Sequence, residues 1–138
     1  GLPPGATVQS WLSPDHKKYG DATATVAAAG NDVIASTHSS CYLNYVGLPL
    51  EKCYAFEPTP AGLAPEAAKH ILGVEPCLWG FPQHRTDGLV FPRLCAFAEV
   101  GWSAQEARNW GDFKARLEPH GRRLDEIGID YHRDPAVW

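Results

Sequence analysis

Aromatic and amide side chains follow three apolar segments of the sequence. Trp11 ends the first segment and Trp79 ends the third, while Tyr42 and Asn44 follow the second. Indole faces stack on the C–H faces of sugar rings, and a tyrosine hydroxyl and an asparagine amide supply polar contacts that orient a ligand. A single tryptophan after an apolar run is more often a core residue. The combination of tryptophan, tyrosine and asparagine at three segment ends favours a pocket for an amino sugar that carries an acetamido group.

The elements that would carry these residues begin with one strand–helix–strand unit. Residues 6–12 are β-branched and aromatic, which predicts a strand, and residues 32–36 predict a second short strand. Between them, the alanine-rich residues 22–29 predict a helix that Asp21 caps and Gly30 ends.

A long segment without regular structure is expected next, over residues 37–63. Loops of this length tend to carry function. A short helix is then predicted from Pro65 to Gly73, followed by a third strand over residues 74–79. A second irregular segment is expected over residues 80–89.

Two helices are predicted at the end of the chain. Apolar residues recur at helical spacing over residues 91–102, which indicates a buried packing helix. Ser103 is expected to cap the next turn, with Glu106 completing a capping box. Residues 110–127 predict an amphipathic final helix, which Pro119 is expected to break or kink.

This order of elements predicts an α/β fold with a parallel sheet. Three strands cannot close a barrel, because about eight strands are needed for a filled (β/α) barrel. The sequence also contains no methionine, so we expect it to be a piece of a longer protein. Residues 1–138 are therefore expected to form one segment, about the last three βα units of a (β/α)8 TIM barrel. The remainder of that barrel is its expected partner.

The charge of the chain argues against two classes of partner. The net charge is −4, the isoelectric point is about 5.8 and the basic residues are thinly spread, so we expect neither nucleic acid nor a membrane surface as a partner. No apolar run approaches the roughly 20 residues that span a bilayer. The sequence gives no compartment.

The four cysteines lie far apart and form no C-x-x-C pair, which argues against a zinc site of the usual type. We expect them to be small core residues, with one disulfide left open. No metal or other cofactor is expected.

Several stretches of the chain also match a known pattern in order and spacing. They are Gln9-Ser10-Trp11, Gly30-Asn31-Asp32-Val33-Ile34, Tyr42-Leu43-Asn44, Gly73-Val74-Glu75-Pro76-Cys77-Leu78-Trp79, Phe91-Pro92-Arg93-Leu94-Cys95-Ala96-Phe97-Ala98-Glu99-Val100-Gly101-Trp102-Ser103, Trp110-Gly111-Asp112-Phe113 and Arg116-Leu117. Together they resemble the last third of the catalytic barrel of family 20 glycoside hydrolases. The resemblance covers nearly the whole chain.

The resemblance implies a retaining β-N-acetylhexosaminidase, which removes terminal N-acetylglucosamine or N-acetylgalactosamine with the substrate's own acetamido oxygen as nucleophile. In this family an Asp-Glu pair on an earlier strand does the proton transfer, so the general acid is expected upstream and not in this chain. Asp125 and Glu126 are adjacent, but they lie in the amphipathic closing helix and are expected to be a solvated surface pair.

The resemblance also assigns roles by position. Trp11 and Trp79 would wall the acetamido pocket, and Tyr42 would donate its hydroxyl to the acetamido carbonyl. Asn44 would contact sugar hydroxyls. Phe81 departs from the family pattern, which has a hydroxyl-binding glutamate two residues after this tryptophan.

Other polar residues near these motifs are expected to have structural or solvent-exposed roles. Possible replacements for the missing glutamate are expected to be solvated loop residues: His84, Arg85 and Asp87. Arg93 and Glu99 would be scaffold residues with buried partners, and His38 would form a hydrogen bond within its loop. There are two alternatives to an enzyme. One is a non-catalytic N-acetylhexosamine-binding protein on a degenerate barrel, which Phe81 favours, and the other is an inactive structural fragment.

Overall fold

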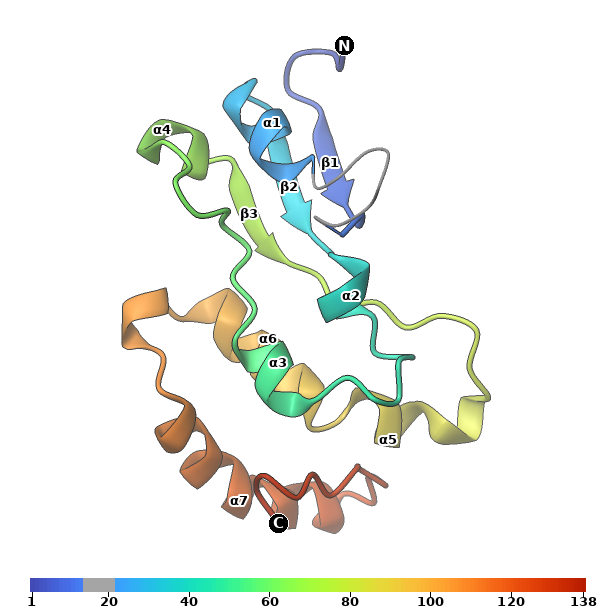
Figure 1. Ribbon diagram of the computed structural model, residues 1–138. Helices are drawn as coiled ribbons and strands as arrows, with labels where there is room; N and C mark the ends of the chain where they lie inside the picture. The colour runs from blue at the N-terminus through green and yellow to red at the C-terminus, as the bar shows by residue number, and fades with distance from the viewer. Residues whose placement is uncertain (14–21) are drawn as a thin grey trace. The chain divides into compact units, whose positions relative to one another are not determined.

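The computed structural model describes residues 1–13 and 22–138 (Figure 1). Asp21, the expected cap of the first helix, lies outside the described residues. Contacts divide the chain into two compact units, which are described separately. The first comprises residues 1–42 and 57–77, and the second comprises residues 43–56 and 78–138.

A parallel sheet forms the centre of the first unit, in the order β1-β2-β3 (Figure 1). Its strands are β1 (Thr7–Ser10), β2 (Asp32–Ala35) and β3 (Ile71–Val74). In the register, Ser10 lies opposite Ala35, and Ala35 lies opposite Val74. The parallel α/β arrangement expected from the alternation of strand and helix patterns is confirmed.

Helices cover one face of this sheet. Helix α1 (Thr23–Ala28) packs on β2 and also contacts helix α4 (Pro65–Ala68). Val33 and Ala35 are buried, whereas Ile34 between them is only half-buried. Because successive side chains of a strand point to opposite faces, one face of β2 is covered and the other is more open.

The third strand begins earlier than the sequence predicted. The helix expected to reach Gly73 ends at Ala68, and β3 starts at Ile71. Pro65 marks where the helix begins but not where it ends, and pairing with β2 makes the residues from Ile71 onward a strand. The pairing register of β2 and β3 shifts here, because Val33 lies opposite Ile71 and Ile34 lies opposite Gly73. Gly73 has a φ of 142°, which glycine adopts more readily than other residues. The expected strand over residues 74–79 is therefore wrong in its bounds.

Parallel pairing continues past the ends of the assigned strands. The Ser36 N–H donates to the Ser10 carbonyl at 2.8 Å, and the Glu75 N–H donates to the Ala35 carbonyl at 2.9 Å. Helix α2 (His38–Cys41) follows β2, in a segment that was expected to be irregular. Beyond it, Tyr42 forms a parallel bridge with Cys77.

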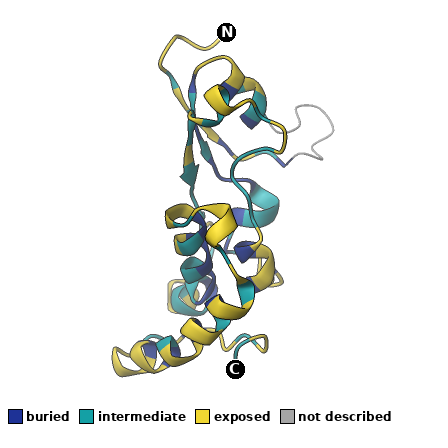
Figure 2. Ribbon diagram, turned by 90° about the vertical axis from the view of Figure 1, so that its left-hand side faces the viewer, coloured by how far each residue is buried: buried dark blue, intermediate teal, exposed yellow. Residues whose placement is uncertain are grey.

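The second unit is helical in its described elements. It contains α3 (Leu50–Tyr54), η1 (Gln83–Arg85), α5 (Thr86–Val90), α6 (Arg93–Trp102), η2 (Gln105–Ala107) and α7 (Trp110–Glu126). Helix α6 packs on α3, and the core includes Leu50, Phe97, Phe113 and Leu117. The buried residues of α7 interrupt a largely exposed surface (Figure 2).

Four local predictions in this unit need correction. Residues 37–63, expected to lack regular structure, contain α3. Residues 80–89, expected to be irregular, contain η1 and most of α5. Ser103 is the C-cap of α6 and not an N-cap, so the expected capping box does not form. Asn109 caps α7 instead, by accepting the Asp112 N–H at 3.0 Å. Helix α7 continues through Pro119, which therefore does not break it.

Candidate functional site

The expected aromatic residues of the first unit follow neighbouring strands. Trp11 comes directly after β1, and its side chain is 49% exposed. The His38 N–H donates to the Trp11 carbonyl at 2.9 Å, so the chain after β2 holds the chain after β1. His38 Nδ1 also lies 2.6 Å from Ser13 Oγ. Its expected role as a hydrogen-bonding loop residue is consistent with these contacts, although it begins α2.

Tyr42 lies where pairing between the extensions of β2 and β3 ends. The Cys77 N–H donates to the Cys41 carbonyl at 2.8 Å, and Tyr42 is bridged to Cys77. Its half-buried ring meets the His38 ring edge-on, with centroids 6.0 Å apart. The backbone and one side of the ring are therefore fixed.

A row of polar side chains runs across the sheet close to these aromatic residues. Gln9 Nε2 donates to Glu75 Oε1 at 2.6 Å. Ser36 Oγ donates to the Glu75 carbonyl at 2.8 Å and lies 3.0 Å from Cys77 Sγ. Gln9, Glu75 and Cys77 lie in the matched motifs, but no role in the site was expected for them. The period of two along a strand was an available signal, because Gln9 is two residues before Trp11.

The second unit holds the other two predicted binding residues. Trp79 is 63% exposed, and Phe81 is half-buried. Asn44 is partly buried, and its Oδ1 has no hydrogen-bond partner among the residues that the structure describes. An acceptor left unpaired in this way costs about 1–3 kcal/mol, which a ligand donor would recover. The structure thus describes Trp11 and Tyr42 in one unit, and Asn44 and Trp79 in the other.

Arg93, expected to be scaffold, is only 5% exposed and its partners are backbone carbonyls. It donates from Nη2 to Leu43 O at 2.7 Å and to Leu89 O, and from Nη1 to Tyr45 O at 2.9 Å. Burial lowers the pKa of Arg93. Burial also raises the pKa of the nearby Cys53 thiol to about 12.

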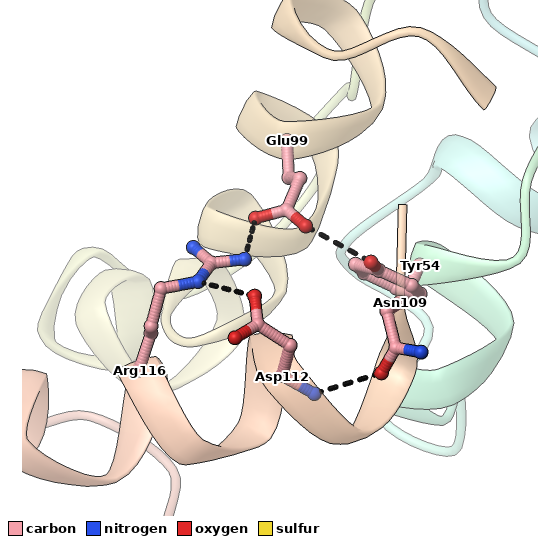
Figure 3. A network of polar contacts seen from close by, with 5 residues as sticks. All are labelled: Tyr54, Glu99, Asn109, Asp112 and Arg116. Atoms are coloured by element: carbon pink, nitrogen blue, oxygen red, sulfur yellow. Dashed lines mark hydrogen bonds and ion pairs between the residues drawn. The ribbon is translucent and has the colours of Figure 1, made fainter. Parts of the chain in front are cut away.

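Glu99, the other expected scaffold residue, belongs to the polar network drawn in Figure 3. Its two oxygens accept from Tyr54 Oη at 2.9 Å and from Arg116 Nη2 at 2.6 Å. Arg116 Nε also donates to Asp112 Oδ2 at 2.8 Å. Burial, and next the Glu99 carboxylate, raise the pKa of Tyr54. Both oxygens of Glu99 are therefore engaged in structural contacts.

The remaining charged candidates lie on exposed or partly exposed elements. His84 and Arg85 are exposed on η1, and Asp87 is half-buried on α5. Asp125 and Glu126 are exposed, and Asp125 Oδ1 lies 2.8 Å from Arg133 Nη2. This arrangement agrees with the expectation of a solvated surface pair.

The four cysteines are free thiols, with Cys41 and Cys53 buried and the other two half-buried. Within residues 1–13 and 22–138, no cluster of three His, Cys, Asp or Glu side chains has the geometry to hold a metal ion. In the same part of the chain, no helix combines the length and apolar character needed to cross a membrane.

Comparison with known proteins decides the family. The model of glycosyl hydrolase family 20, catalytic domain, matches residues 1–105. The chain belongs to this family. The expectation from its motifs is thereby confirmed. A β-hexosaminidase of Porphyromonas gingivalis is 34% identical over 96% of this family 20 chain, which covers 18% of that relative. A β-N-acetylhexosaminidase of Cellulomonas fimi is 32% identical over 99% of the chain, which covers 30% of it.

Solved family 20 structures agree in fold. The exo-β-N-acetylglucosaminidase of Vibrio harveyi, in complex with N-acetylglucosamine, superposes with a TM-score of 0.78 at 32% identity. The match covers 94% of this chain and 22% of that one. The β-N-acetylhexosaminidase of Streptomyces coelicolor gives 0.82 at 29% identity, covering 99% and 31%. The family 20 chain therefore spans less than a third of the length of these relatives.

Proposed function

We propose that the whole protein containing this chain is a retaining β-N-acetylhexosaminidase, which hydrolyses terminal non-reducing N-acetylglucosamine or N-acetylgalactosamine. Family membership supports this, and so do the names of the relatives. The observation that carries the proposal is the position of Tyr42 at the carboxyl edge of the sheet, where it is bridged to Cys77 in the extension of β3. In barrels of this kind the active site lies at that edge.

The chain would supply about the last three βα units of the barrel. Among the described residues, β1 and β3 each pair only with β2, so both edges of the sheet are open. An edge strand presents a row of unpaired N–H and C=O groups, to which a further strand can add. The rest of the barrel would pair with these edges and would carry the Asp-Glu pair that transfers the proton.

Tyr42 would take part in the chemistry itself. Its hydroxyl would donate to the acetamido carbonyl oxygen as that oxygen attacks the anomeric carbon. A donor held in place before the reaction stabilises developing charge without reorganisation. The bridge to Cys77 and the contact with His38 are the features that would hold it.

Binding would fall to the other three predicted residues. Trp11 and Trp79 expose large apolar faces, which suits contact with the acetamido methyl and the sugar ring. Asn44 Oδ1 is an unpaired acceptor and would take a hydrogen bond from a sugar hydroxyl.

A second candidate is a non-catalytic N-acetylhexosamine-binding protein. Phe81 favours it, because the family has a hydroxyl-binding glutamate at this position. Release of the aryl group from an aryl β-N-acetylglucosaminide by the whole protein separates the two. Titration with an N-acetylglucosamine thiazoline, which mimics the oxazoline intermediate, adds a binding measurement. Turnover with tight thiazoline binding supports the enzyme, whereas binding of the sugar without turnover supports the second candidate.

A further inference from the structure

The buried guanidinium group of Arg93 holds the segment that carries Asn44. Arg93 begins α6, and its Nη2 donates to the Leu43 carbonyl at 2.7 Å while its Nη1 donates to the Tyr45 carbonyl at 2.9 Å. These two carbonyls belong to the residues immediately before and after Asn44. Nη2 also donates to the Leu89 carbonyl in α5. One side chain therefore ties both neighbours of Asn44 to the helical core of the second unit.

Arginine is the side chain that suits this task. Its guanidinium group presents several N–H donors in one rigid plane, whereas the ammonium group of lysine is a compact point charge on a flexible stem. Burying such a charge is costly unless polar groups solvate it, and the three carbonyls do so here. The stability of this site therefore depends on the carbonyls staying where they are.

The side chain of Asn44 has a feature that indicates ligand binding. Its Oδ1 is buried and lacks a hydrogen-bond partner among the described residues, so the folded chain keeps a costly unpaired acceptor. A flexible segment would relieve this by turning the amide toward water. Leu48 adds to the restraint, because its N–H donates at 2.9 Å to the same Tyr45 carbonyl that Arg93 binds.

We propose that Arg93 is a positioning residue for sugar binding, because it fixes the backbone on both sides of Asn44 before a ligand hydroxyl arrives. This inference rests on the proposed function, in which Asn44 binds the sugar. Preorganisation improves binding by removing an ordering cost. The effect of Arg93 should therefore be seen in KM and in the Kd for the sugar, and not in kcat.

A double-mutant cycle in the whole protein tests the proposal, with an aryl β-N-acetylglucosaminide as substrate. Arg93→Lys is expected to raise KM roughly 3- to 10-fold, the effect of weakening one hydrogen bond, with kcat within about twofold. In the Asn44→Ala background, the same substitution is expected to raise KM by less than about twofold, because its effect passes through Asn44.

Arg108→Lys is the matched control. Arg108 Nη1 also donates to a backbone carbonyl of the second unit, that of Phe56, at 3.1 Å. This control should leave KM unchanged, even where it lowers the melting temperature. An increase in KM of equal size in both Asn44 backgrounds, or an unchanged KM in Arg93→Lys, would overturn the inference.

Amide exchange of the wild-type protein covers the case in which Arg93→Lys does not fold. The Leu48 N–H should exchange slowly without sugar. Fast exchange that becomes slow only after N-acetylglucosamine is added would contradict preorganisation. The two proposals fail differently: a wild-type protein that neither hydrolyses nor binds the sugar removes both, whereas an active protein with an additive cycle removes only the role of Arg93.

Discussion

Tyr42 and Trp11 have exposed or half-buried side chains on a fixed backbone. The carbonyl of Trp11 accepts the His38 N–H, and Tyr42 is bridged to Cys77. Because their backbone is held before a ligand arrives, binding would not have to order that backbone. At the residue scale, the candidate site is therefore defined by how the chain holds the backbone of these two residues.

Cys53 predicts a dependence of stability on pH. Burial raises its pKa from 9.0 to about 12, so the folded state keeps a proton that the unfolded state loses first. The contribution to stability is complete below pH 9 and is lost as pH rises toward about 12. The free energy of unfolding of the whole protein should fall more steeply with pH above 9 than that of Cys53→Ala. Parallel curves from urea titrations would contradict the assignment.

Glu99 and Asp112 offer a matched pair of charges on Arg116. The Glu99 side chain is 12% exposed and that of Asp112 is 65% exposed. Glu99→Gln is expected to lower the free energy of unfolding by about 0.5–1.5 kcal/mol, because it weakens two partly buried contacts. Asp112→Asn should change it by less than about 0.5 kcal/mol. Urea denaturation measures both, and a larger effect at Asp112 would refute this ranking.

At the element scale, α6 connects the segment around Asn44 to the core of the second unit. Phe97 on α6 is 2% exposed and contacts the ring of Phe56 edge-on, with centroids 6.4 Å apart. Phe97→Ala should lower the free energy of unfolding by about 3–5 kcal/mol, because it leaves a cavity. Phe97→Leu keeps most of the volume and should cost clearly less. Equal losses in the two variants would indicate that the ring does not pack as described.

The sequence predicted elements well where side-chain pattern alone decides them. The spacing of apolar residues predicted α6 and α7. The alanine-rich run predicted α1, and Gly30, which was expected to end that helix, has a φ of 79°. It failed where tertiary pairing decides. The helix predicted from Pro65 was expected to reach Gly73, yet pairing with β2 makes residues 71–73 part of a strand. Ser103 has the chemistry of an N-cap, but α6 ends there.

The candidate site was predictable only in part. Trp11, Tyr42 and Trp79 stood out because large aromatic residues follow apolar runs. Arg93 was expected to be scaffold. Its hydrogen bond to the carbonyl before Asn44 joins residues 50 positions apart in the sequence, so no local pattern predicts it. The hydrogen bond between Gln9 and Glu75 spans 66 residues, and no local pattern reports it.

At the scale of the whole molecule, the open sheet predicts how the chain behaves alone. Both edge strands lack a second partner in the described part of the chain, and Leu72 and Trp102 are 57% and 92% exposed. Unpaired edges and exposed apolar side chains promote association. The 138-residue chain by itself should self-associate in sedimentation experiments. A soluble monomer with a sharp, cooperative melt would contradict this expectation.

The central claim is that Tyr42 assists the attack of the acetamido oxygen, and the turnover of Tyr42→Phe in the whole protein tests it most directly. With an aryl β-N-acetylglucosaminide, kcat should fall about 100- to 1,000-fold, the loss typical of removing one donor to developing charge. KM should change little. A kcat within twofold of the wild-type value, in a protein that folds and binds the sugar normally, would contradict the claim.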